Sequence, residues 1–217
     1  MVKYLLIIFL LIADIAFANC YNCHAINAGD AVIEHAKTYL YVREKTNNND
    51  APEINKWLKN CGLGSGYSYC AAFVSSMYKE IYEKQNKKSP WPMSAGVASF
   101  AQQCTKKPFE FKIVSTKKLQ WGIDSVQPGD VISWKHGSSI FTGFNYLGHK
   151  GIGIDNKGSI IHTIEGNTKA GPGGDQSGTV KGDMKYGHEG VYLRDRQLGL
   201  NTNFPIMFII KPIKKEI

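Results

Sequence analysis

The apolar residues of this chain change their spacing about half-way along it. In the first half they recur every three or four positions, as on one face of a helix, whereas in the second half they form short alternating or continuous runs, as in strands. A chain with helices first and strands afterwards favours an α+β architecture. We therefore expect an α+β fold in which N-terminal helices pack on an antiparallel β-sheet.

The same pattern predicts where the individual elements lie. The expected helices cover 28–44, about 50–61, 70–84 and 95–103, and the expected strands cover 131–134, 151–154, 160–164 and 206–210. Residues 170–190 are rich in glycine and polar side chains, which predicts a long loop or hairpin. No repeat and no convincing linker divides the chain, and its length suits a single domain.

The start of the chain has the three-part pattern of an export signal. A basic residue precedes an apolar run, and small residues stand at the positions before a cut after Ala18. We expect residues 1–18 to be a signal peptide and residues 19–217 to form one catalytic domain that begins at Asn19. Lipidation of Cys20 is the alternative, which the preceding asparagine disfavours. The protein is thus expected to be secreted or to lie in the periplasm or cell envelope, without stable membrane insertion after cleavage.

Export makes the cysteine count informative, because exported proteins tend to oxidise their thiols. The chain has five cysteines, and an odd number leaves at least one thiol unpaired or intermolecular. Four structural cysteines in disulfide bonds and one reactive cysteine explain the count most simply. The cysteines are Cys20, Cys23, Cys61, Cys70 and Cys104. We expect Cys70 to be the only free thiol, and the spacing leaves the pairing of the others open.

A second motif uses two of these cysteines. Cys20, Cys23 and His24 match the C-x-x-C-H pattern of covalent haem attachment in exported proteins. A c-type haem protein is therefore an alternative, although the motif lies before all the expected helices and strands. Disulfide formation by both cysteines is the more ordinary interpretation, and no other cofactor is expected.

Cys70 follows a glycine-rich loop and stands at the expected start of an apolar helix. A helix N-terminus carries partial positive charge and free backbone N–H groups. It can therefore lower the pKa of a thiol and donate hydrogen bonds to an oxyanion. The structural alternative is a small cysteine buried under the helix.

Polar residues also stand at the ends of two consecutive expected strands. His149 begins one strand between glycines, and Glu165 and Asn167 end the next. Neighbouring antiparallel strands place the end of one beside the start of the other, so Glu165 should reach the distal nitrogen of His149. A cysteine hydrolase needs such a base, and an acidic partner fixes its tautomer. A structural histidine and an ordinary strand-end turn are the alternatives.

Four segments occur in order between residues 28 and 168. They are Tyr69-Cys70-Ala71-Ala72-Phe73-Val74-Ser75, Pro128-Gly129-Asp130-Val131-Ile132, Gly148-His149-Lys150-Gly151-Ile152 and Ile164-Glu165-Gly166-Asn167. In order and rough spacing they resemble the CHAP-type peptidoglycan hydrolases, which are similar to the NlpC-type and papain-like cysteine peptidases. The resemblance implies a papain-like CHAP core. It also implies Cys70 as nucleophile, His149 as general base, Glu165 as its orienting group and Asn167 as an additional polar site residue.

The resemblance further implies the reaction and its partners. The expected activity is that of a cysteine amidase or endopeptidase, which hydrolyses amide bonds in bacterial peptidoglycan or its stem peptides through a thioester. The net charge of +8 suits attraction to the anionic polymers of a cell envelope, with an ordinary solvated basic surface as the alternative, and no nucleic-acid-binding signature is present. An inhibitor or immunity protein is a further expected partner. A non-catalytic wall-binding relative and an enzyme with a different substrate remain alternatives.

The chain departs from the family pattern at three places. Tyr69 replaces the tryptophan or glutamine that often precedes the nucleophile, and its hydroxyl is a candidate oxyanion donor. Lys150 follows the histidine where an apolar residue is usual, which predicts a more exposed strand edge. Residues 59–69 contain none of the aspartates through which some relatives bind calcium, so no metal is expected.

Overall fold

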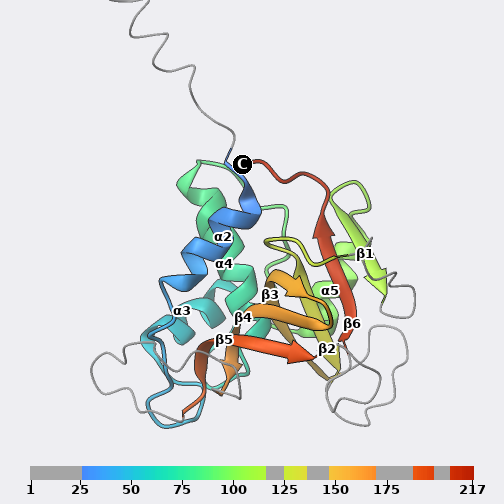
Figure 1. Ribbon diagram of the computed structural model, residues 1–217. Coiled ribbons are helices and arrows are strands. Elements are labelled where there is room, and N and C mark those ends of the chain that lie inside the picture. Colours follow the sequence, from blue (N-terminus) through green and yellow to red (C-terminus); the bar gives the residue numbers. More distant parts are fainter. Residues whose placement is uncertain (1–25, 116–124, 136–146, 170–187, 198–205) are drawn as a thin grey trace, which may run out of the picture.

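The computed structural model describes residues 26–115, 125–135, 147–169, 188–197 and 206–217. Within these ranges every helix precedes every strand, which confirms the expected α+β fold (Figure 1). The helices are α2 (Ala28–Lys37), α3 (Pro52–Asn60), α4 (Cys70–Lys84) and α5 (Val97–Thr105). The strands are β1 (Phe111–Ser115), β2 (Val131–Lys135), β3 (Gly148–Lys157), β4 (Ile160–Thr168), β5 (Gly190–Gln197) and β6 (Ile206–Pro212).

The strands form one antiparallel sheet in the order β1-β6-β2-β3-β4-β5. The C-terminal strand β6 lies between β1 and β2, so the sheet closes only after the last part of the chain has been added. Its continuation pairs with the start of the described chain, where the N–H of Ile217 donates to the carbonyl of Ile26 over 2.9 Å. The middle strands β2, β3 and β4 contain residues of the second, third and fourth motif segments.

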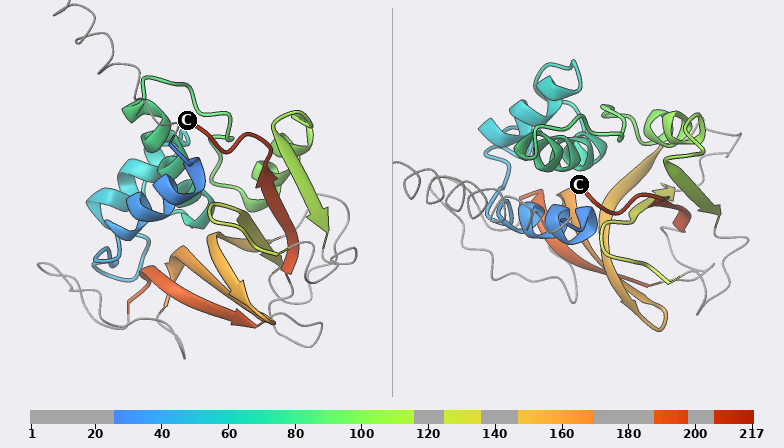
Figure 2. Two further views of the ribbon diagram at one scale, coloured as in Figure 1. Left: turned by 45° about the horizontal axis from the view of Figure 1, so that its top comes forward. Right: turned by 90° about the horizontal axis from the view of Figure 1, so that it is seen from above.

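The helices cover one face of the sheet (Figure 2). Helix α4 packs against β3 and β4, with α2 and α3 beside it, while α5 packs against β1 and β3. A large apolar core fills the space between the two layers, and a smaller cluster lies on the other face of the sheet. The smaller cluster consists of Val114, Val126, Ile132, Trp134, Ile161 and Ile209.

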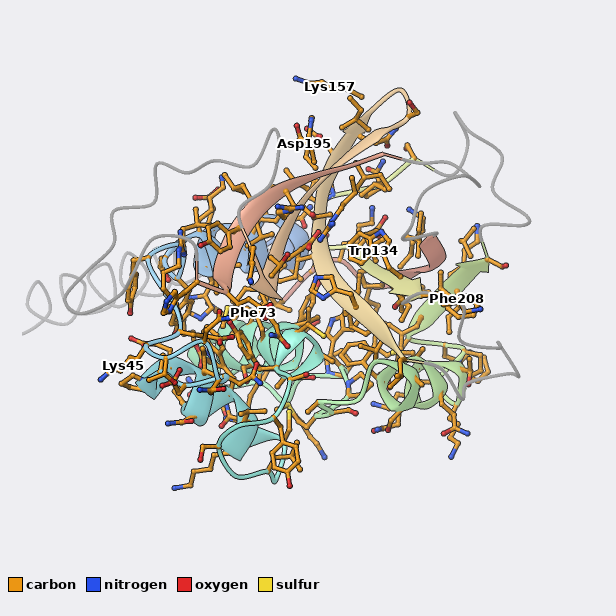
Figure 3. All side chains as sticks on the ribbon, turned by 90° about the horizontal axis from the view of Figure 1, so that it is seen from below. Lys45, Phe73, Trp134, Lys157, Asp195 and Phe208 are labelled. Atoms are coloured by element: carbon orange, nitrogen blue, oxygen red, sulfur yellow. The ribbon has the colours of Figure 1, made fainter. Side chains whose placement is uncertain are left out.

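Helix α4 is the central element of the helical layer. Eleven of its fifteen residues are buried, which agrees with an apolar face that extends most of the way round the helix. Its Phe73 packs directly on Gly166 of β4, where a Cβ atom would lie only 2.9 Å from the Phe73 Cβ (Figure 3). The glycine therefore lets the helix and the sheet approach closely at the end of β4 that carries the site residues.

The predicted elements largely agree with the structure, with two differences. The helix expected over 28–44 ends at Lys37. Beyond it the chain turns and forms a β-bridge from Arg43 to Gly190. The apolar residues after α2 therefore belong to a segment without regular secondary structure. Strands β1 and β5 were not expected, and β3 and β4 are longer than the apolar runs that predicted them.

Several predictions fall outside the described residues. They concern the signal peptide at 1–18, the Cys20-x-x-Cys23-His24 motif and most of the loop expected at 170–190. Among the helices that the structure describes, none is both long and apolar enough to cross a membrane.

Candidate active site

Cys70 is the first residue of α4, as the sequence predicted. No side chain caps this end of the helix, and no acidic residue lies in its first turn. The backbone N–H groups of that turn are therefore directed at the region of the sulfur without a carboxylate competing for them. The residue is largely buried, but it lines a cleft.

His149 lies one residue into β3 and is hydrogen-bonded to the Cys70 thiol. On its other side, Nε2 donates to Oε2 of Glu165 over 2.8 Å. This bond leaves Nδ1 as the ring nitrogen that can face the sulfur. The ring also lies against Trp134, with 5.6 Å between the ring centroids. The structure thus brings the three residues together in the order thiol, imidazole, carboxylate.

The Glu165 carboxylate is completely buried and accepts hydrogen bonds at both oxygens. Oε1 accepts from Arg196 Nε over 2.8 Å and from Thr163 Oγ1 over 2.7 Å, while Oε2 accepts from His149 and from Arg196 Nη2. Burial disfavours the charge, but Arg196 and His149 outweigh it and hold the pKa of Glu165 well below its usual range. The group is therefore a permanent anion behind the imidazole.

Asn167 has a different environment from the other three residues. Its Oδ1 accepts from the backbone N–H of Tyr69 over 3.0 Å, and its Nδ2 donates to Glu189 over 2.7 Å and to Asn49 over 3.1 Å. Its φ of 59° places it in the left-handed region, which asparagine tolerates better than most residues. It therefore joins the end of β4 to the residue before the nucleophile, and it is a positioning residue.

The ionisation of Cys70 and His149 follows from their contact. Burial opposes both charged forms, but the hydrogen bond with Cys70 and the bond and charge of Glu165 raise the pKa of His149 to about 9. Burial likewise opposes the thiolate, yet the hydrogen bond and charge of His149 and the charge and backbone N–H of Lys150 lower the pKa of Cys70. The contact therefore shifts the pair toward thiolate and imidazolium.

Cys70 and His149 both line a cleft of about 760 Å³. Small residues at the start of α5 line it together with His149 and the exposed Leu147. Asn167 and Glu189 add polar groups to the lining. The complete lining is Ser68, Cys70, Ala95, Gly96, Val97, Ala98, Ser99, Gln102, Leu147, Gly148, His149, Asn167 and Glu189. A substrate with an extended backbone could reach the sulfur here.

Three expectations need correction. The Tyr69 hydroxyl is buried and does not line the cleft, so it cannot be an oxyanion donor there. Lys150 is completely buried rather than at an exposed edge. Cys61 and Cys104, like Cys70, are free thiols, so Cys70 is not the only one. Cys61 ends α3 and Cys104 lies in α5, and neither is paired with another described cysteine.

Sequence reasoning missed Arg196 and Glu189, which both lie in or beside the unexpected strand β5. The alternation from Val191 to Arg196 was the available signal for that strand. Among the described residues, no group of three or more histidine, cysteine or acidic side chains is arranged to hold a metal ion.

No protein-family model matches the chain, and no curated protein or solved structure is significantly similar to it.

Proposed function

We propose that this protein is an exported cysteine hydrolase that cleaves amide bonds in bacterial peptidoglycan or its stem peptides. The observation that carries the proposal is the continuous chain of hydrogen bonds from Cys70 through His149 to Glu165, with the sulfur at a helix N-terminus beside an open cleft. A buried cysteine with a purely structural role needs neither a charged partner nor access to a cleft. We also propose a papain-like CHAP core, which the order of helix, strand and strand carrying these residues supports.

In the proposed reaction the Cys70 thiolate attacks the carbonyl carbon of the scissile amide. The negative charge moves to the carbonyl oxygen, where the free N–H groups at the start of α4 can stabilise it. The imidazolium of His149 then gives its proton to the leaving nitrogen as the C–N bond breaks, and a thioester remains on Cys70.

Water completes the cycle. The neutral His149 removes a proton from the water as its oxygen attacks the thioester carbonyl, and the carboxylic acid and the thiolate separate. Glu165 stays ionised throughout and stabilises the imidazolium each time it forms. Arg196 and Thr163 hold that carboxylate in place.

Peptidoglycan as substrate is supported by the four motifs that resemble CHAP-type hydrolases, by the export signal expected at residues 1–18 and by the net charge of +8. Purified peptidoglycan should be incubated with the wild-type protein and with the Cys70→Ala variant, and the soluble products analysed by mass spectrometry. We expect fragments with one new amine and one new carboxyl group per cut from the wild type only. Identical products from both proteins, or no products from a wild type whose Cys70 is reactive, would exclude this substrate.

A further inference from the structure

Glu189 brings a carboxylate into the cleft that also contains Cys70 and His149. Among the described residues that line this cleft, Glu189 is the only acidic one, and no lysine or arginine is among them. The proposed reaction gives Glu189 no part in the bond changes. An ionised carboxylate only accepts hydrogen bonds and attracts cations, so Glu189 makes this part of the cleft favourable for a positively charged group.

Hydrogen bonds fix both the main chain and the side chain of Glu189. Its backbone N–H donates to Oδ1 of Asn47 over 3.0 Å, and its carbonyl accepts from the N–H of Glu44 over 2.8 Å. Its Oε2 accepts from Nδ2 of Asn167 over 2.7 Å, and Oδ1 of that asparagine accepts from the backbone N–H of Tyr69. A single side chain, that of Asn167, therefore joins the carboxylate to the residue before the nucleophile.

Three asparagines with a left-handed backbone support this arrangement. Asn47, Asn49 and Asn167 have φ values of 65°, 57° and 59°, and they are three of the four non-glycine residues with positive φ in the described part of the chain. Asn49 is linked to Asn167, because its Oδ1 accepts from Nδ2 of Asn167 over 3.1 Å. Such residues persist where surrounding contacts fix them, and they are concentrated in active sites and ligand-binding sites. The carboxylate of Glu189 is therefore held in a preorganised position.

The second oxygen of this carboxylate is available to a ligand. Within the described part of the chain, Oε1 of Glu189 accepts no hydrogen bond, and no basic side chain forms an ion pair with the carboxylate. The residue is half-buried and lines the cleft. Because hydrogen bonds between charged groups are about twice as strong as those between neutral groups, a cationic donor is the ligand that suits this oxygen best.

Resting on the proposed role of Cys70 as the nucleophile of this cleft, we propose that Glu189 binds a primary ammonium group of the substrate. It thereby selects amides that carry a free amino group near the scissile bond. The stem peptides of peptidoglycan contain diamino acids, whose side-chain amine is free unless it forms a cross-link. Glu189 therefore distinguishes stem peptides with a free amine from those whose amine is already part of an amide.

Two small thiol reagents test this binding site without peptidoglycan. Aminoethyl methanethiosulfonate carries an ammonium group, whereas methyl methanethiosulfonate is neutral. With both, the Cys70 thiolate attacks the sulfenyl sulfur, a mixed disulfide forms and methanesulfinate leaves. The ratio of the two rates at Cys70 cancels any change in the reactivity of the thiol. We expect Glu189→Gln to lower this ratio about fivefold, which corresponds to unit charges about 8 Å apart at an effective dielectric constant of about 40.

The Glu189→Gln variant keeps an oxygen that can accept from Asn167, so it removes the charge but not the hydrogen bond. The matched control is Glu83→Gln, because this carboxylate is exposed near the far end of α4 and pairs only with Lys79. It removes an identical charge and should leave the ratio unchanged. An unchanged ratio in Glu189→Gln would overturn the proposal. So would an equal decrease in both variants, because that result indicates only an effect of the net charge.

A second measurement tests the selectivity with the wild-type protein. Acetic anhydride converts the free amines of purified peptidoglycan into neutral amides and leaves its peptide bonds intact. We expect the wild type to cleave the acetylated material roughly 10- to 100-fold more slowly than the untreated material, as for the loss of a hydrogen bond between charged groups. Glu189→Gln should cleave both at the same slow rate. Equal wild-type rates on the two materials would overturn the proposal even if Glu189→Gln does not fold.

The two measurements separate this proposal from the proposed function. A wild type that cleaves neither material would exclude peptidoglycan as the substrate, while the ratio of the reagent rates would still decide whether Glu189 binds an ammonium group. Hydrolysis that is lost in Cys70→Ala, but does not respond to acetylation or to Glu189→Gln, would support the hydrolase and overturn only the role of Glu189.

Discussion

At the scale of single residues, the site consists of groups whose charges depend on one another. The imidazole of His149 is buried, and an isolated buried histidine would be neutral. Its contacts with Cys70 and Glu165 reverse that preference and raise its pKa to about 9. Cys70 and His149 therefore depend on each other and on Glu165 for their reactive ionisation states, whereas Glu165 is also kept ionised by Arg196.

Residues that act as one unit have strongly non-additive effects on a reaction. We expect Cys70→Ala and His149→Ala each to reduce hydrolysis of the amide substrate by at least about 1000-fold, and the double variant to be no slower than either. Circular dichroism should show that all three variants remain folded. A His149→Ala variant with near-normal activity would direct attention to His136, His162 or His188 as the base.

The pKa of His149 sets the alkaline limit of the reaction. The imidazolium must give a proton to the leaving nitrogen, so hydrolysis should fall as pH rises through about 9. Glu165→Gln removes the anion that stabilises the imidazolium, and this limit should then move to lower pH by at least about one unit. Alkylation of Cys70, which needs no proton donor, should show no such alkaline decrease in the wild type.

Thr163→Val is the matched control for Glu165→Gln. It removes the 2.7 Å hydrogen bond to the same carboxylate but leaves its charge in place. The alkaline limit should therefore move much less. Equal shifts in the two variants would mean that the charge of Glu165 is unimportant for His149.

At the scale of the elements, the site exists because four of them meet at one edge of the helix–sheet interface. Helix α4 supplies the thiol, β3 the imidazole, β4 the carboxylate and β5 the guanidinium. Glycines allow this close approach. Gly151 lies against Glu165, where a Cβ would be 2.7 Å from Glu165 Cγ and 3.3 Å from the backbone oxygen of Ile164.

Gly151→Ala should therefore displace Glu165 from His149 without removing any functional group. We expect a loss of unfolding free energy of about 1–3 kcal/mol, as is usual for an added methyl group in a packed interior. Hydrolysis should fall, and its alkaline limit should move toward that of Glu165→Gln. Gly64→Ala is the control, because the space around Gly64 is open, and both stability and the pH profile should stay unchanged.

At the scale of the whole molecule, the three cysteines that the structure describes lie in different elements rather than in one cluster. Cys61 ends α3, Cys70 begins α4, and Cys104 is fully buried in α5. Burial raises the pKa of Cys61 to about 11 and that of Cys104 to about 12. Both are therefore neutral and slow to react, whereas the pKa of Cys70 is lowered.

Alkylation of the unreduced, denatured protein should consequently label Cys61, Cys70 and Cys104. In the native protein near neutral pH, Cys70 should be labelled first, and Cys70→Ala should lose the fast reaction. Mass spectrometry of the peptides would locate each label. A disulfide bond at Cys61 or Cys104 in the exported protein would contradict this prediction.

The sequence alone determined the class of the fold and most of the proposed reactive group. Local periodicity predicted the start of α4 at Cys70, because a glycine-rich loop followed by an apolar helical face is a short-range signal. It also predicted that Glu165 would reach His149, since consecutive antiparallel strands must lie side by side when a short turn joins them. These inferences involve only neighbouring segments of the chain.

The tertiary structure alone decided which distant groups complete the site. Arg196 reaches Glu165 because β5 pairs with β4, and Asn167 reaches Tyr69 because β4 packs under α4. The sequence predicted an exposed strand edge at Lys150, whereas in the structure this side chain is buried against Phe100 of α5. Hydrophobic periodicity identifies the buried face of an element, but it contains no information about which remote element covers that face. The charges around Cys70 therefore depend on long-range packing that no local pattern specifies.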